Sequence, residues 1–187
     1  MPARSSMSPL DLGRCAVTVV DLRERAPGFF GTPQPDSTER PVDYPTYLPG
    51  TKIHFGTEEA ARYLWYGWSG RESISQWTDR GKATLIFSLN AAEQKQTKTI
   101  RLYSAPFLAL GKLDAQRVIV RLNDREVADW KLMSAEPQLR SIEIPAGLLR
   151  LQNVLLFDLP DATSPGALGL SDDWRLLGLN VQWLEID

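Results

Sequence analysis

The chain has 187 residues, of which 43% are hydrophobic and 24% are charged, with a formal net charge of −2 at pH 7. This length is enough for one domain with a substantial core. The small net charge gives no electrostatic case for binding nucleic acid or for attachment to an anionic membrane.

The N-terminal region carries few structural signals. Residues 1–13 are small and polar, which predicts a flexible tail. They lack the apolar segment of a signal peptide, and Cys15–Val20 is too short an apolar run to span a bilayer. The single cysteine excludes an internal disulfide and fits a reducing compartment. We therefore expect a cytoplasmic protein with no membrane insertion.

Residues 14–187 are predicted to form one domain. Cys15–Val20 is rich in β-branched residues and predicts a strand. Residues 26–50 are so rich in proline and glycine that neither a helix nor a central strand can form there. We interpret this stretch as a long ordered loop that is anchored by aromatic residues such as Tyr44 and Tyr47.

Strand signals then recur about once per dozen residues, with turn residues between them. Asn123–Asp124–Arg125 is a tight-turn sequence and predicts a hairpin. One short helical turn is indicated after Thr57, a good N-cap residue that is followed by two glutamates. The pattern favours an all-β fold, an antiparallel two-sheet β-sandwich with jelly-roll-like connections. The predicted strands are 51–56, 82–89, 97–105, 117–123, 126–133, 139–145, 153–160 and 177–186.

The residues that commonly carry catalysis or bind metals are scarce. His54 is the only histidine and lies on a predicted strand, no Gly-x-Ser-x-Gly motif is present, and Cys15 lies in an apolar run. One histidine and one cysteine do not make a usual zinc site. Asp172 and Asp173 offer oxygens for calcium, but the loop pattern of a known calcium site is absent. We therefore predict no cofactor, no metal and no catalytic residue.

An enzyme that acts on polysaccharide remains an open alternative, because two carboxylates can hydrolyse a glycoside. Nothing in the sequence shows which pair would face each other. Asp172 and Asp173 are poor partners for one another, since adjacent residues of an extended segment point to opposite faces. The candidates are Glu58, Glu59, Glu72, Asp79, Asp172 and Asp173.

Aromatic residues give the strongest functional signal. Six tryptophans are present, and three of them fall within residues 62–79. Aromatic faces stack on sugar rings while nearby polar groups bind the hydroxyls, which predicts carbohydrate recognition by an exposed loop with freedom at Gly67 and Gly70. The alternative is core packing, which we favour for Trp77 and Trp183. The candidate carbohydrate-binding residues are Trp65, Tyr66, Trp68, Arg71 and Glu72.

Two stretches, 67–89 and 164–186, together with the strand–turn–strand between them, form a recognisable pattern. Residues 50–187 resemble an uncharacterised bacterial β-sandwich domain that is found at the C-terminus of glycosyltransferases and other surface-polysaccharide proteins. Trp174 departs from the motif, because a small residue or proline is more usual there. The specific part is Ser-Pro-x-x-Leu-Gly-x-Ser-x-Asp-x-Arg-x-Leu-Gly, which is met by Ser164, Pro165, Leu168, Gly169, Ser171, Asp173, Arg175, Leu177 and Gly178.

The resemblance implies a role in handling a glycan or polysaccharide, with a glycosyltransferase or another protein as a further partner and with no catalytic residues. It also suggests that Asp173 and Arg175 form a structural corner before the last strand. There Asp173 would accept hydrogen bonds from backbone N–H groups and pair with Arg175 or another arginine. A protein-binding adaptor remains an alternative to a carbohydrate-binding module.

Overall fold

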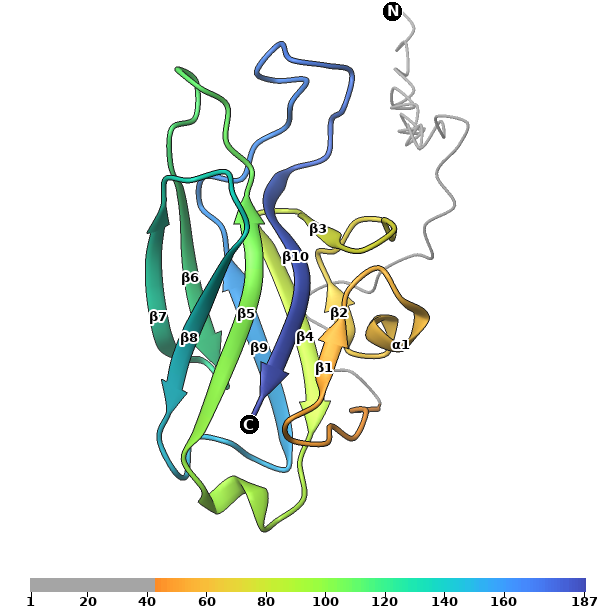
Figure 1. Cartoon of the computed structure of the whole chain (residues 1–187), viewed down its shortest axis with the longest axis vertical. Coiled ribbons are helices and arrows are strands. Elements are labelled where there is room, and N and C mark those ends of the chain that lie inside the picture. Colours follow the sequence, from red (N-terminus) through yellow and green to blue (C-terminus); the bar gives the residue numbers. More distant parts are fainter. Residues whose placement is uncertain (1–42) are drawn as a thin grey trace, which may run out of the picture. The chain divides into compact units, whose positions relative to one another are not determined.

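The computed structural model describes residues 43–187, which form two antiparallel five-stranded sheets packed face to face (Figure 1). The predicted all-β sandwich is therefore confirmed. The predicted tail 1–13, the strand at Cys15–Val20 and most of the loop 26–50 lie outside the described residues. The extent of the domain over residues 14–187 stays a prediction.

Each sheet combines strands that are distant in the sequence. The first has the order β1–β10–β5–β8, with β3 also paired to β10, and the second has the order β2–β4–β9–β6–β7. A short helix, α1 (Glu58–Ala61), follows β1, and a 3₁₀ helix, η1 (Glu93–Lys95), precedes β5. The strands are β1 (Lys52–His54), β2 (Leu64–Tyr66), β3 (Gln76–Asp79), β4 (Lys82–Ser88), β5 (Lys98–Pro106), β6 (Gln116–Leu122), β7 (Arg125–Leu132), β8 (Gln138–Ile144), β9 (Gln152–Asp158) and β10 (Leu177–Ile186).

Local sequence signals account for the turn and the cap. Asn123 and Asp124 both adopt positive φ, 50° and 71°, as the hairpin turn between β6 and β7 requires. Thr57 caps α1, where its hydroxyl accepts a hydrogen bond from the backbone N–H of Ala60 at 3.2 Å. Both features were predicted. The strands β2 and β3 were not, because three or four residues are too few for a sequence pattern to show alternation.

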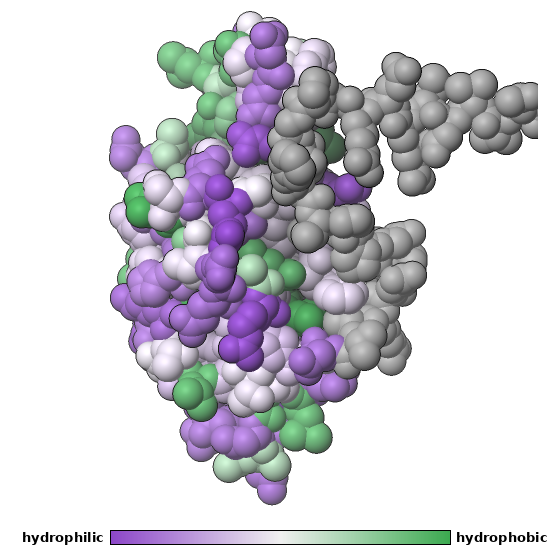
Figure 2. All heavy atoms as spheres, turned by 90° about the vertical axis from the view of Figure 1, so that its right-hand side faces the viewer, coloured by the Kyte–Doolittle hydropathy of each residue, from purple (hydrophilic) through white to green (hydrophobic). Residues whose placement is uncertain are grey.

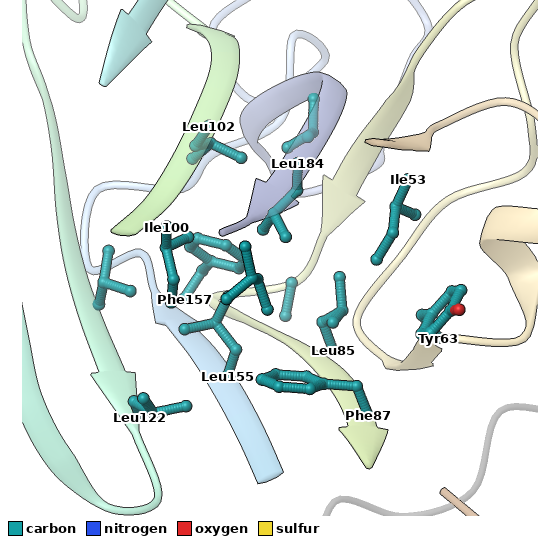
Figure 3. Close-up of a cluster of buried hydrophobic side chains, with 14 of the residues drawn as sticks. Ile53, Tyr63, Leu85, Phe87, Ile100, Leu102, Leu122, Leu155, Phe157 and Leu184 are labelled. Atoms are coloured by element: carbon teal, nitrogen blue, oxygen red, sulfur yellow. The ribbon is translucent and has the colours of Figure 1, made fainter. Parts of the chain in front are cut away.

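The core lies between the two sheets and is built from alternate residues of each strand. Leu85 and Phe87 of β4 and Leu155 and Phe157 of β9 belong to it from one of the two sheets, and all four are at most 1% exposed (Figure 3). Burial of side chains of this size contributes about 1.5–3 kcal/mol each.

The segment before β1 is anchored in this core, as predicted for its aromatic residues. Tyr47 is 1% exposed and packs edge-on against Phe87. Its hydroxyl accepts a hydrogen bond from the backbone N–H of Ile186 at 2.8 Å, which ties the segment to the last strand. Over residues 43–187, no helix is long and apolar enough to cross a membrane.

Candidate functional site

Trp68, one of the predicted carbohydrate-binding residues, belongs to the core. It is 5% exposed, its indole N–H donates to the carbonyl of Thr84 at 2.9 Å, and its ring lies 5.1 Å from that of Phe55 and 6.2 Å from that of Phe157. The expectation of an exposed ring is therefore wrong for Trp68, because neither face of the indole is open to a sugar.

The other four predicted residues do not assemble around a common point. Trp65 and Tyr66 lie half-buried on the edge strand β2, and the guanidinium of Arg80 lies 5.2 Å from the Tyr66 ring. Arg71 pairs with Glu58 at 3.3 Å on the surface. The carboxylate of the next residue, Glu72, lies 3.7 Å from the guanidinium of Arg175 in the predicted corner.

Trp183, expected in the core, lies half-buried on the outer face of its sheet. A bulge in β10 between Val181 and Trp183 shifts the alternation, and Trp183 becomes the partner of Tyr103, with the rings 5.8 Å apart. The ammonium of Lys52 lies 4.1 Å from the Trp183 ring centroid. The side chains of Lys52 and Tyr103 therefore lie against this indole. Trp77 is also only half-buried, edge-on to Phe107.

The predicted corner pair is present. Asp173 accepts from Nε of Arg175 at 3.1 Å and from its Nη2 at 2.7 Å, a two-point contact, and also from the backbone N–H of Arg175 at 3.0 Å. Asp173 is half-buried rather than fully buried. Asp79 of β3 holds Leu176, the residue after Arg175, because its carboxylate accepts a hydrogen bond from the backbone N–H of Leu176 at 2.9 Å. These contacts fix the chain where it enters β10.

The two aspartates have opposite electrostatic surroundings. The hydrogen bonds from Arg175 hold the pKa of Asp173 below its ordinary value of 3.8. Burial raises the pKa of Asp79, despite the hydrogen bond from Leu176 and the positive charges of Arg175 and Arg80. The charged form of Asp173 is thus the one that the fold favours.

Acid should therefore weaken the corner. A carboxyl whose pKa is lowered by folding stabilises the protein above its unfolded pKa and loses that contribution as the pH falls through its folded value. We expect Asp173→Asn to lower the free energy of unfolding at pH 7 by about 1–3 kcal/mol. The difference from wild type should shrink as the pH falls below about 4. Urea unfolding at several pH values measures this. A difference that is constant with pH would contradict a stabilising role of the charge.

The corner contains an exposed aromatic residue that is not among the predicted carbohydrate-binding residues. Trp174 lies between the paired Asp173 and Arg175 and is 71% exposed. A Cβ at Gly166 would lie 2.9 Å from both ring-fusion carbons of the indole, so the backbone of Gly166 faces the flat of the ring. One face of the indole is thus supported, and the rest of the ring is open to solvent.

Trp174 is held by a well-connected loop. The backbone N–H of Gly166 donates to the carbonyl of Asp173 at 2.7 Å, and the ammonium of Lys112 donates to the carbonyl of Leu168, which joins this loop to the β5–β6 loop. Both loops lie at the upper end of the sandwich in Figure 1. Apolar residues show at that end in Figure 2, and three leucines of the two loops are exposed, Leu110, Leu170 and Leu176.

Polar groups lie close to Trp174 along the chain. Ser171 and Asp172 are exposed, and Arg175 and Glu72 form an ion pair at 3.7 Å whose side chains remain partly exposed. The loop that carries Trp174 therefore also carries exposed hydrogen-bonding groups. In residues 43–187, no group of three or more His, Cys, Asp or Glu side chains is placed to hold a metal ion. The sequence signal for this site was Trp174 itself, at a motif position where a small residue or proline is more usual.

Comparison with known proteins finds weak structural similarity at low sequence identity. No family model matches the chain. No curated protein matches it either. Among solved structures, a family 35 carbohydrate-binding module from an environmental isolate has a TM-score of 0.37 and 17% identity, covering 67% of this chain and 75% of the module.

Two further structures show the same level of similarity. The C-terminal domain of the sugar-binding protein EclA has a TM-score of 0.36 and 19% identity, covering 81% of this chain and 84% of that domain. A family 115 4-O-methyl-α-glucuronidase with specificity for decorated arabinogalactans has a TM-score of 0.42 and 12% identity, and the match covers 62% of this chain but only 14% of the enzyme.

Proposed function

We propose that this protein is a non-catalytic carbohydrate-binding domain and that Trp174 is its principal contact with the sugar. The observation that carries the proposal is an indole that is 71% exposed and yet supported on one face by the backbone of Gly166. Leu170 and Leu176 of the same loop are also exposed, and exposed apolar patches commonly mark binding sites. A role beside a glycosyltransferase in handling surface polysaccharide rests on the sequence resemblance alone.

The chemistry of the site suits a pyranose ring. The open face of Trp174 is available for the C–H face of a sugar, and a ring that is already fixed loses little conformational entropy on binding. Asp172 accepts hydrogen bonds from hydroxyls, and the partly exposed Arg175–Glu72 pair offers a donor and an acceptor. Because hydroxyls exchange water for protein partners, we expect a dissociation constant between about 1 μM and about 1 mM.

Retention on a glycan array tests this function. Trp174→Ala should reduce affinity for a retained glycan by about 5- to 30-fold, which corresponds to a loss of about 1–2 kcal/mol from one stacked ring. Its melting temperature should stay close to that of wild type, because the indole is mostly exposed. Trp183→Ala is the matched control, since Trp183 is also partly exposed but lies on the outer face of a sheet.

Three results would contradict the proposal. The wild type could retain no glycan on any array, Trp183→Ala rather than Trp174→Ala could abolish retention, or the protein could release products from a glycan that it retains. The last result would favour the enzyme alternative.

Binding to another protein is the second candidate function. It is favoured by the exposed leucines of the two loops, among which Leu110 is 100% exposed. Exposed apolar patches commonly mark protein interfaces. Replacement of Leu110 and Leu170 by serine should leave glycan retention unchanged if the site binds sugar through Trp174, whereas an interface built on the apolar patch would be lost.

A further inference from the structure

A groove with no role in the proposed function lies between the edge strands of the two sheets. Strands β7 and β8 neighbour each other at the open side of the sandwich (Figure 1). The groove between them has a volume of about 570 Å³. It is lined by Asp129, Trp130, Lys131, Leu132, Met133, Ser134, Gln138 and Arg140.

The side chain of Arg140 points toward the interior of the sandwich. It is the antiparallel partner of Leu102, which is 1% exposed, and cross-strand partners point to the same face of a sheet. Trp130 reaches the groove from the opposite sheet in the same way, as the partner of the buried Val118. The guanidinium of Arg140 lies 5.9 Å from the Trp130 ring centroid.

The hydrogen bonds of Arg140 go to neutral acceptors. Its Nη1 donates to the carbonyls of Ser104 at 3.2 Å and Gln138 at 3.3 Å, and its Nη2 donates to the side-chain oxygen of Gln138 at 3.1 Å. No carboxylate of residues 43–187 forms an ion pair with it. Burial lowers the pKa of this guanidinium. A partly buried cation without a counter-ion is unfavourable, so an anion that enters the groove would be stabilised.

Two other arginines show how the Nε and Nη2 atoms of a guanidinium together bind a carboxylate. Arg117 holds Asp129 through Nε at 3.0 Å and Nη2 at 2.7 Å. Arg175 holds Asp173 through the same two nitrogens. In Arg140, Nη2 donates a hydrogen bond to the side-chain amide oxygen of Gln138 and to no carboxylate among the described residues. A carboxylate that displaced this amide would gain the two-point contact that arginine prefers.

The two charged residues of β7 in the lining point away from the interior. Lys131 is the cross-strand partner of the exposed Arg117, and Asp129 is paired with Arg117, so Arg140 is the charged side chain of the lining that faces Trp130.

We propose that this groove is a second binding site, in which Arg140 takes the carboxylate of an acidic sugar residue beside the indole of Trp130. The proposal shares with the proposed function only the class of ligand. It does not involve Trp174, and the two sites are tested separately. An arginine that points inward from an edge strand also hinders edge-to-edge association, and a purely protective role is the alternative that the test must exclude.

The test titrates the full chain with methyl β-D-glucuronide and, in parallel, with the uncharged methyl β-D-glucoside and with acetate, while the indole N–H resonances are followed by NMR. The glucuronide should shift the Trp130 resonance with a millimolar dissociation constant, and the glucoside and acetate should bind at least about ten-fold more weakly. Arg140→Gln should weaken the glucuronide by about ten-fold or more, because a charge-assisted contact is lost.

Two further variants separate a binding site from a protective residue. Arg140→Lys keeps the charge, and so the protection of the edge, but it loses the planar two-point donor and should also lose the glucuronide. Arg125→Gln, at the exposed far end of β7, should bind the glucuronide like wild type. Trp174→Ala should keep the Trp130 response even if it loses all array retention.

The proposal is overturned if the glucuronide does not move the Trp130 resonance, if Arg140→Gln or Arg140→Lys binds it as wild type does, or if the glucoside or acetate binds equally well. An unmoved Trp130 resonance, or wild-type binding by Arg140→Gln, would leave Arg140 as an edge-protecting residue. Wild-type binding by Arg140→Lys alone would show that the planar two-point contact contributes nothing. Equal binding of the glucoside would show that the carboxylate contributes nothing, and equal binding of acetate would show that the sugar ring contributes nothing.

Discussion

Trp68→Ala is expected to lower the free energy of unfolding by about 3–5 kcal/mol, the usual cost of truncating a large core aromatic. The indole is 5% exposed and packs between Phe55 and Phe157, so alanine would leave a cavity that these rings cannot fill. The carbonyl of Thr84 would also lose the indole donor. Urea unfolding followed by circular dichroism measures the change.

Trp174→Ala is the matched control for Trp68→Ala, because it removes the same side chain from an exposed position and should change stability by less than about 0.5 kcal/mol. Trp68→Phe keeps most of the volume and removes the hydrogen bond, so its cost should lie between the two. If Trp68→Ala unfolds at the urea concentration of wild type, the ring is not part of the core, and the exposed-loop interpretation of this segment returns.

Gly67→Ala is expected to lower the free energy of unfolding by about 4 kcal/mol or more, a loss that few single substitutions cause. A Cβ at this position would lie 1.9 Å from the carbonyl oxygen of Lys82, and that oxygen belongs to the backbone of β4 and cannot rotate away. The residue also has a φ of +77°, which alanine adopts only at a cost. The yield of folded protein and its urea midpoint report the effect.

Gly70→Ala provides the control for Gly67→Ala within the same segment. A Cβ at Gly70 would meet no atom within 4 Å, and we expect a change of less than about 0.5 kcal/mol. Equal stability of the two variants would mean that Gly67 does not approach β4 as closely as the structure has it.

Gly67 also explains why sequence reasoning placed Trp68 incorrectly. The two glycines were interpreted as freedom to present rings outward, but at Gly67 the lack of a side chain serves a close approach to Lys82. That approach joins residues that are not neighbours in the sequence and turns Trp68 toward Phe157 of β9. No local pattern distinguishes these two uses of glycine.

Other elements were predictable because their cause is local. The alternation of β4, β5 and β9 follows from the residues of each strand, and the Asn123–Asp124 turn from the residues of one hairpin. Trp183 fails the same reasoning, because a bulge that forms only when β10 pairs with β5 changes the face to which it points. The Asp173–Arg175 pair was expected from the motif, but the support of Trp174 by Gly166 depends on the loop folding back on itself.

The role of Trp174 as the principal sugar contact is tested by the response of the six indole N–H resonances to a glycan that the array retains. We expect the Trp174 resonance to shift with the affinity measured for retention, while the resonance of the buried Trp68 stays in place. If a bound glycan shifts the resonance of Trp65 or Trp183 and leaves that of Trp174 unchanged, Trp174 is not the sugar contact.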